Sequence, residues 1–232
     1  MTAPLLEAAG LRRAFGAQRA VDGVDLALAA GECLALFGPN GAGKTTTLRL
    51  LAGLLSPTAG RAAVGGVALP SAAARARVGL ISHRTMLYDA LTARENVAFA
   101  AGLHGLRGAD VVTRALAALR VADRADVPVR ALSRGLRQRV AIARAVVHAP
   151  DVLLCDEPYT GLDDPGAAAL TALLLERRAA GAALVVVTHQ LQEGLAVATH
   201  AAVMRAGRLV RLERAEGLDL ARYAADYRAL VA

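Results

Sequence analysis

Short apolar runs alternate along this chain with segments in which apolar residues recur at helical spacing. Four of the runs are bounded by turn residues, which predicts strands buried on both faces, as in a parallel sheet. These runs span residues 33–37, 78–82, 151–155 and 184–188. Residues 24–29 alternate apolar with polar or small side chains, and we expect them to pair with 5–12 in an antiparallel sheet. Gly65 and Gly66 predict a further hairpin turn.

Helical spacing dominates from about residue 92 to residue 149. Thr92 followed by Glu95 has the form of a capping box at a helix start. Further helices are predicted at 109–119, 135–148 and 165–179, and two short strands at 201–205 and 208–213. In the tail, apolar residues at helical spacing predict a helix that packs on the core. They are Leu220, Tyr223, Tyr227 and Leu230.

This succession predicts a single α/β domain over residues 1–232. Its core is expected to cover about 1–86 and 150–232, with an antiparallel β-subdomain at the front, and a helical subdomain is inserted at about 87–149. Alternation of strands and helices on either side of the insertion implies right-handed crossovers and a covered parallel sheet.

A glycine-rich loop lies between the apolar run 33–37 and a helical pattern, and it matches the phosphate-binding pattern G-x-x-x-x-G-K-[ST]. It consists of Gly38, Pro39, Asn40, Gly41, Ala42, Gly43, Lys44, Thr45 and Thr46. Its backbone N–H groups and the following helix N-terminus would bind an anion. Lys44 would reach the β- and γ-phosphates, and the Thr45 hydroxyl would bind Mg²⁺. Lys44 is the only lysine among 27 basic residues, which favours a site where arginine cannot substitute.

Two more strands end in polar residues that suit phosphate chemistry. Asp156 ends one apolar run and is a candidate Mg²⁺ ligand beside the phosphate loop. Glu157 is placed to deprotonate an attacking water, as phosphoryl transfer to water requires. His189 follows the next apolar run. We favour contact of its side chain with the γ-phosphate over a purely structural role.

Residues 132–139 open the last helix of the insertion. Ser133 is a candidate N-cap, and a hydroxyl, Gly135 and a helix N-terminus together also suit an anion. The chain would then carry two phosphate-binding surfaces, the second of which acts on a nucleotide held by another subunit.

Composition bears on the location of the chain and on the class of partner that it binds. Hydrophobic residues make up 55 % and mean hydropathy is +0.40, yet the longest apolar run, 182–187, is too short to span a membrane. The N-terminus lacks the features of a signal peptide, so a cytoplasmic location is expected. Cys33 and Cys155 are expected to be buried rather than paired or metal-bound. Net charge is +7 but aromatic content is only 3 %, which disfavours nucleic acid and favours an arginine face turned to solvent or to a membrane-bound partner.

Taken together, five ordered motifs resemble the ATP-binding subunit of an ABC transporter. They are residues 38–46, 132–139, 153–158, 161–163 and 188–189. The resemblance implies a P-loop NTPase (RecA-like) core with the two subdomains above, and a head-to-tail dimer, homodimeric or with a related subunit, that encloses two ATP molecules with Mg²⁺. It also implies that Ser133 and Gly135 touch the opposite subunit's γ-phosphate, that Asp163 lies along the dimer seam and that Phe15 stacks on adenine. Phe15 as an ordinary core residue remains the alternative.

Two stretches depart from the family pattern. Arg134 and Leu136 replace the usual first glycine and the glutamine of the signature. His83 stands where a glutamine usually approaches Mg²⁺ and signals to the membrane subunit, so its role as a metal ligand is open. The stretch 81–96, together with 132–135, resembles more narrowly the haem-exporter ATPases of cytochrome c maturation.

The sequence therefore predicts an ATP hydrolase, peripheral on the inner face of the cell membrane, that energises export through a separate integral membrane subunit. An ABC-2-type multidrug exporter or another solute exporter is the alternative within the family. A soluble ABC ATPase acting on ribosomes or DNA is disfavoured, because such proteins carry tandem halves or long coiled-coil insertions. A regulatory subunit without turnover is disfavoured because Glu157 and His189 are both present.

Overall fold

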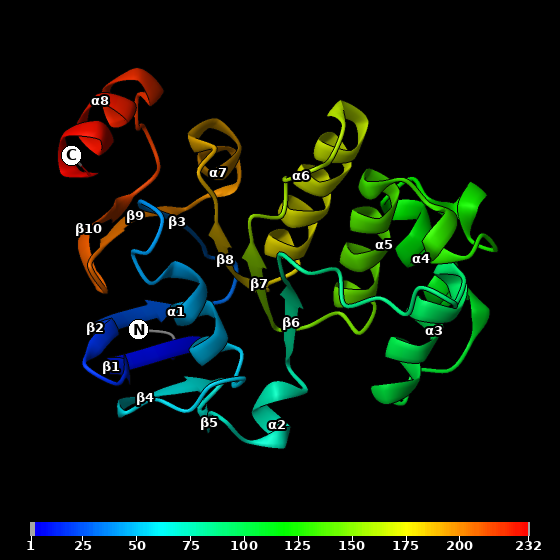
Figure 1. Cartoon of the computed structure of the whole chain (residues 1–232), viewed down its shortest axis with the longest axis horizontal. Helices are drawn as coiled ribbons and strands as arrows, with labels where there is room; N and C mark the ends of the chain where they lie inside the picture. Colours follow the sequence, from blue (N-terminus) through cyan, green and yellow to red (C-terminus); the bar gives the residue numbers. More distant parts are fainter. Residues whose placement is uncertain (1–2, 232) are drawn as a thin grey trace.

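A six-stranded, mostly parallel sheet forms the centre of the computed structural model, which describes residues 3–231 (Figure 1). Met1, Thr2 and Ala232 belong to the predicted 1–232 domain but lie outside the described residues. The strands in spatial order are β10 (Arg208–Arg214), β9 (His200–Arg205), β3 (Cys33–Phe37), β8 (Ala183–Val187), β7 (Val152–Asp156) and β6 (Val78–Ile81). Only β10 pairs antiparallel. The four predicted parallel strands are confirmed, and β3, β7 and β8 end at one edge.

The front of the chain forms a separate four-stranded antiparallel sheet. Its strands in spatial order are β2 (Gln18–Leu28), β1 (Leu6–Phe15), β4 (Ala59–Val64) and β5 (Val67–Ala68). The first two strands are longer than the predicted 5–12 and 24–29, and their hairpin closes where Phe15 pairs with Gln18. Register shifts after Ala8, Leu11 and Arg13 interrupt the alternation of buried and exposed residues, which hides the strand ends from a period-two pattern.

Helices fill the connections between strands. They are α1 (Lys44–Leu51), α2 (Ala72–Arg75), α3 (Ala93–Leu103), α4 (Ala109–Ala118), α5 (Arg134–Val146), α6 (Asp164–Ala179), α7 (Leu191–Val197) and α8 (Leu220–Val231), with two 3₁₀ turns at Ala122–Arg124 and Val129–Ala131. The predicted capping box is confirmed at α3, where Thr92 accepts from the Glu95 amide and Glu95 accepts from the Thr92 amide. The short helices α2 and α7 were not predicted.

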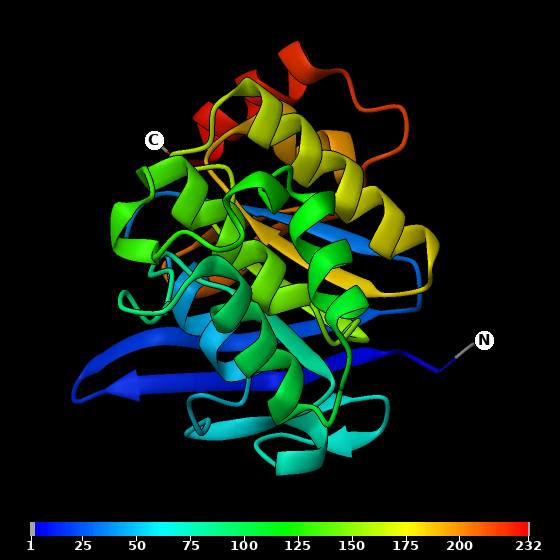
Figure 2. The same cartoon turned by 90° about the vertical axis from the view of Figure 1, so that its right-hand side faces the viewer.

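The six-stranded sheet separates two hydrophobic layers. Figure 2 turns the molecule so that the helices beyond the β6 edge face the viewer. On one face, alternate residues of β3, β7 and β8 pack with α1 and the four-stranded sheet. On the other face, the intervening residues pack with helices α3 to α6. Because both faces are covered, these strands read as continuous apolar runs. Helices α3, α4 and α5 gather beyond the β6 edge (Figure 1).

The C-terminal helix α8 covers the remaining part of this second face. Tyr223 is 2 % exposed, and its ring meets the ring of Phe37 edge-on, with centroids 5.7 Å apart. The predicted core role of the tail is therefore confirmed for Tyr223. Cys33 and Cys155 are buried free thiols, as predicted. Among the described residues, no helix is both long and apolar enough to cross a membrane.

Candidate nucleotide site

The phosphate loop connects β3 to α1 in a conformation that requires glycine. Gly38 has φ 148° and Gly43 has φ 105°, which is backbone that side chains rarely adopt. A Cβ at Gly38 would collide with the Met204 carbonyl, and one at Gly43 with the Ala20 carbonyl. The loop is therefore pressed between β9 and β2, and its path is fixed by neighbours on both sheets.

Lys44 begins α1 with its side chain folded back into the loop. The ammonium donates to the carbonyl of Gly38 at 2.6 Å and to that of Pro39 at 3.0 Å. Lys44 is only 9 % exposed, and burial lowers the pKa of its ammonium, while the carboxylates of Glu157 and Asp156 oppose that shift. The geometry thus places one cation inside the loop with both carboxylates nearby.

Thr45 and Asp156, the two predicted Mg²⁺ ligands, lie in direct contact. The Thr45 hydroxyl donates to Asp156 Oδ2 at 2.9 Å and lies 3.2 Å from Oδ1. Asp156 is the last residue of β7 and is 7 % exposed. Burial raises the pKa of its carboxyl group, although the Thr45 bond pulls that pKa down. A hydroxyl and a carboxylate are hard oxygen donors, the set that Mg²⁺ prefers.

Glu157 and His189 form a pair that sequence reasoning did not foresee. His189 Nδ1 and Glu157 Oε2 are 2.8 Å apart, and the His189 amide also donates to this oxygen at 3.3 Å. Glu157 has φ 51°, and its amide donates to the Val187 carbonyl at 2.8 Å. The signal was available, because β7 and β8 are neighbouring parallel strands and the residues that follow them lie side by side.

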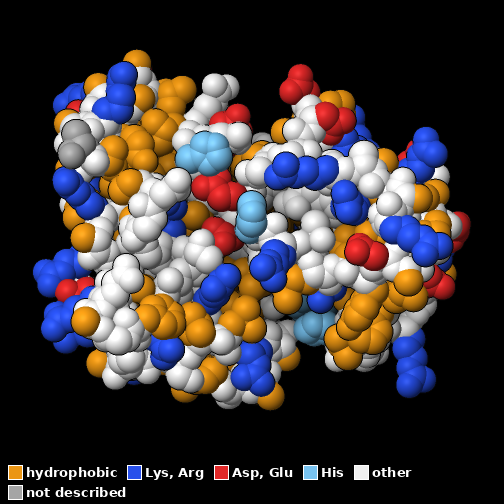
Figure 3. Space-filling view, in the orientation of Figure 1, with side chains coloured by type: hydrophobic (Ala, Val, Ile, Leu, Met, Phe, Trp, Pro, Cys, Tyr) orange, Lys and Arg blue, Asp and Glu red, His pale blue; other side chains and the backbone are white. Residues whose placement is uncertain are grey.

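The loop, Glu157 and the hairpin tip enclose a cleft of about 400 Å³, which we call the phosphate-loop cleft. Its lining comprises Phe15, Gln18, Ala20, Asn40, Gly41, Ala42, Gly43, Lys44, Thr45, Thr46, Asp156, Glu157 and Val187. Phe15 is 47 % exposed, so the alternative that it is an ordinary core residue is wrong. Figure 3 shows acidic and histidine side chains lying next to one another near the middle of this face.

Ser133, Gly135 and Asp163 do not line that cleft. Ser133 caps α5, where its hydroxyl accepts from the Leu136 amide at 3.3 Å, as predicted. Asp163 caps α6 by accepting from the Gly166 amide at 3.2 Å, and it forms an ion pair with Arg139 that the sequence did not indicate. These residues thus lie apart from the phosphate loop of their own chain.

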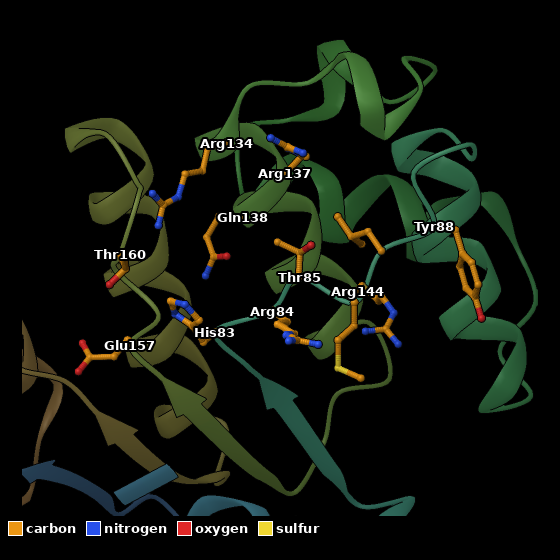
Figure 4. A pocket seen from close by; sticks show the side chains of 12 residues that line it. His83, Arg84, Thr85, Tyr88, Arg134, Arg137, Gln138, Arg144, Glu157 and Thr160 are labelled. Atoms are coloured by element: carbon orange, nitrogen blue, oxygen red, sulfur yellow. The ribbon is translucent and has the colours of Figure 1, made fainter. Parts of the chain in front are cut away.

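A second cleft of about 690 Å³ lies between residues 83–88, α5 and the loop after β7 (Figure 4). We call it the arginine cleft, because its lining includes Arg84, Arg134, Arg137 and Arg144. Glu157 is its only lining carboxylate, and Figure 4 shows Glu157 and Tyr88 on opposite sides. Within residues 3–231, none of these arginines forms an ion pair.

His83 lies where the two clefts approach each other. It lines the arginine cleft and also a smaller cavity of about 360 Å³ that Thr45 and Asp156 line. Its ring is close enough to Asp156 to act on the pKa of that carboxyl, as the last of several causes.

Comparison with known proteins agrees with this geometry. The family model described as "ABC transporter" matches residues 21–160. A Nod factor export ATP-binding protein I of Ralstonia nicotianae is 38 % identical over 212 residues, which cover 89 % of this chain and 66 % of the relative. A cobalt import ATP-binding protein of Rhodobacter capsulatus is 43 % identical over 218 residues, which cover 89 % and 78 %. The chain thus spans about two thirds of the length of the first relative.

Solved structures show the same fold. An ATP-binding subunit of an ABC transporter superposes with a TM-score of 0.88 at 28 % identity, covering 97 % of this chain and 99 % of that one. A dimeric ATP-binding cassette in a post-hydrolysis state, bound to ADP and Pi, gives a TM-score of 0.83 at 25 % identity, covering 92 % and 100 %. The predicted fold class and ATP hydrolase domain are confirmed. Haem export is not indicated by these relatives, one of which is named for export and one for import. With its phosphate loop, strand-end carboxylates and overall fold, the chain belongs to the ABC transporter family and carries the ATP-binding ATPase domain of that family.

Proposed function

We propose that this chain binds Mg·ATP in the phosphate-loop cleft and hydrolyses it to drive transport through a separate membrane subunit. The observation that carries the proposal is the convergence of Lys44, the Thr45–Asp156 contact and the Glu157–His189 pair at one sheet edge. Each is a part that phosphoryl transfer to water requires: a cation for the phosphates, oxygen ligands for the metal and a general base.

The loop amides and Lys44 would hold the β- and γ-phosphates. Lys44 would exchange its two carbonyl acceptors for phosphate oxygens, and this exchange preserves its hydrogen bonds while adding charge attraction. The hydroxyl and carboxylate of Thr45 and Asp156 would hold Mg²⁺, with His83 as a further group beside them. When bound, Mg²⁺ supplies neutralisation of phosphate charge.

Glu157 would accept a proton from the attacking water through its carboxylate. The contact with His189 Nδ1 fixes the orientation of the Glu157 side chain, and His189 and Lys44 would stabilise the charge that develops on the γ-phosphate. Both members of the pair retain access to solvent, with side-chain exposures of 24 % for Glu157 and 66 % for His189.

We further propose that two such domains form a dimer, either with a second copy or with a related ATPase subunit. In it, Ser133 and Gly135 would meet the nucleotide of the opposite subunit, and Asp163 would lie along the seam. Support comes from the position of these residues outside their own cleft and from the dimeric state of the related cassette.

The arginine cleft is the place where we propose that the membrane subunit docks. Met86, Tyr88 and Phe99 are exposed there or beside it, and the rings of Tyr88 and Phe99 meet edge-on with centroids 5.4 Å apart. Cations and exposed apolar groups together suit a protein segment that is both acidic and apolar. The chain would then lie on the inner face of the cell membrane, with a helical subdomain at about 87–149 and a catalytic core at about 1–86 and 150–232.

Export is the direction that we favour, with haem for cytochrome c maturation as the narrowest substrate. The support is the resemblance of residues 81–96 and 132–135 to that exporter group, and a relative named for export. An ABC-2-type multidrug exporter or another solute exporter is the second candidate. Co-purification of the membrane subunit, followed by haem binding to that complex, would separate these substrates.

The proposal is tested by comparing the native chain with Glu157→Gln. The variant should bind Mg·ATP as the native chain does, lose turnover by about 100-fold or more, and accumulate an ATP-bound dimer in size-exclusion chromatography. Unchanged steady-state hydrolysis would remove Glu157 as the base. Failure of the native chain to bind Mg·ATP would remove the whole proposal. Hydrolysis that membrane protein never stimulates would instead favour a soluble ABC ATPase.

A further inference from the structure

Arg13 lies beside the one aromatic side chain in the phosphate-loop cleft. It precedes Phe15 by two positions in β1, and although β1 shifts register between Arg13 and Ala14, the two side chains lie in contact. The guanidinium Cζ of Arg13 is 4.7 Å from the centroid of the Phe15 ring, within the range of a cation–π contact. One face of the ring is therefore covered by a cation belonging to the same chain.

The guanidinium is itself held in place by a hydrogen bond to the connection between α1 and β4. Arg13 Nη1 donates to the Ser56 carbonyl at 2.9 Å, and Ser56 lies in the connection that leads from α1 to β4. No ion pair to Arg13 occurs within the described range 3–231, and its Nε is buried without a partner. The ring is thus the principal group that its positive charge faces.

The neighbouring Arg12 has a different set of partners from Arg13. Arg12 points to the other face of the sheet, where its Nε lies 3.6 Å from Asp22 Oδ1. Asp22 also accepts from Arg208, so the charge of Arg12 is shared within an ion-pair cluster. Two adjacent arginines therefore have different roles in the structure, and Arg12 is a matched control for Arg13.

We propose that Arg13 is a positioning residue for the nucleotide base, which acts by fixing the Phe15 ring so that its uncovered face stacks on the base. The inference rests on the proposed function, since it takes the cleft to bind ATP. A ring locked before binding loses less conformational freedom when the base arrives. Stacking on such a ring tolerates any purine, because each presents a π-face.

The test is steady-state hydrolysis and binding by the purified chain with Arg13→Ala, Arg12→Ala and Phe15→Leu. Arg13→Ala should raise KM and Kd for Mg·ATP about fivefold, the effect of losing one cation–π contact, and leave kcat within about twofold because no reacting atom is touched. Arg12→Ala should leave both constants unchanged. In a Phe15→Leu background, Arg13→Ala should add nothing further, since Arg13 acts through the ring.

A second probe distinguishes the base from the phosphates. Ribose 5-triphosphate, which has no base, should bind native chain and Arg13→Ala equally well. Equal weakening of ATP and ribose 5-triphosphate binding by Arg13→Ala, or additive losses in the double variant, would overturn the proposal. If the native chain bound neither ATP nor ribose 5-triphosphate, the ATP site itself would be refuted. Failure of the proposed function is therefore distinguishable from failure of the inference about Arg13.

Discussion

The two clefts of this molecule differ in how their charges are satisfied. In the phosphate-loop cleft, Lys44 donates to carbonyls of its own loop, Thr45 donates to Asp156, and Glu157 is paired with His189. In the arginine cleft, four guanidinium groups surround a larger volume with one carboxylate among the lining residues. Both clefts share Glu157, so the base that we propose for hydrolysis faces both of them.

This difference indicates two modes of recognition. The phosphate-loop cleft holds its polar groups ready through bonds that a ligand can replace one for one, which lowers the cost of reorganisation on binding. The arginine cleft leaves its cations to be paired by something outside the chain. We therefore propose that the first cleft takes a small anion and that the second takes a surface that supplies opposite charge.

Among these predictions, removing the cation of the phosphate-loop cleft should give the largest loss of ATP affinity. Lys44→Ala removes the only cation in its lining, so affinity for Mg·ATP should fall by about 100-fold, as expected for loss of two charge-assisted hydrogen bonds. Lys44→Arg keeps the charge but presents a planar fork in a space shaped for an ammonium, and we expect it to be nearly as defective. Titration with a fluorescent ATP analogue measures both. Native-like affinity in Lys44→Ala would refute the role of the loop.

The backbone of Tyr88, which lines the arginine cleft, is hydrogen-bonded to one buried side-chain amide. Asn96 is 1 % exposed. Its Oδ1 accepts from the Tyr88 amide at 2.8 Å, and its Nδ2 donates to the carbonyls of Tyr88 and Thr92. Asn96→Ala should lower the free energy of unfolding by about 2–3 kcal/mol, because these backbone groups lose their partner.

Urea unfolding measures the effect of Asn96→Ala, and Arg94→Ala is the matched control. Arg94 lies on the same helix and pairs with exposed Asp126, so its loss should change the free energy of unfolding much less than the loss of Asn96. ATP affinity should stay near the native value in both variants. A large loss of ATP affinity in Asn96→Ala would show that the two clefts are not separable.

His83 lines the arginine cleft and also the smaller cavity that shares Thr45 and Asp156 with the phosphate-loop cleft, so we expect it to connect the two clefts. We expect His83→Ala to reduce stimulation of ATP hydrolysis by the membrane partner about fivefold, the effect of one lost hydrogen bond, with a smaller change in ATP affinity. The measurement is ATPase activity with and without the reconstituted membrane subunit. Equal losses of stimulation and affinity would confine His83 to nucleotide binding.

A further prediction concerns the pH dependence of stability and a histidine pair that follows helices α3 and α5. The rings of His104 and His148 stack with centroids 3.7 Å apart, and burial, followed by the charge of His104, lowers the pKa of His148 to about 4. Between pH 6.5 and 4 the unfolded chain therefore binds more protons than the folded chain, so stability falls as pH falls through that window. In His148→Phe, stability should fall less between pH 7 and pH 5 in urea unfolding. An unchanged difference would contradict the assignment.

Sequence reasoning was most successful where the candidate functional residues are contiguous in the chain. The phosphate loop is contiguous, and its glycines, Lys44 and Thr45 are specified by spacing alone. Asp156 lies 111 positions from Thr45, and it was predicted as a second Mg²⁺ ligand because it ends a strand beside the loop; the two side chains lie in contact. The Arg139–Asp163 ion pair could not be found in this way. Side-chain partners between helices depend on packing that no local period records.

The fold was predicted well for the buried parallel strands and less well at the front of the chain. Burial on both faces gives these strands an unmistakable apolar run. In β1 and β2, register shifts break the alternation, and the strands continue to Phe15 and Gln18 beyond the predicted ends. That extension brings Phe15 to the cleft; the family resemblance, rather than the strand pattern, implied an exposed ring at this position.

The extended hairpin also has a mechanical consequence. Phe15 belongs to the four-stranded sheet, whereas the phosphate loop leaves the six-stranded sheet. A nucleotide that contacts one sheet through its base and the other through its phosphates would link the two sheets. Cleavage of the terminal phosphate would then change the contacts at one of its two ends only.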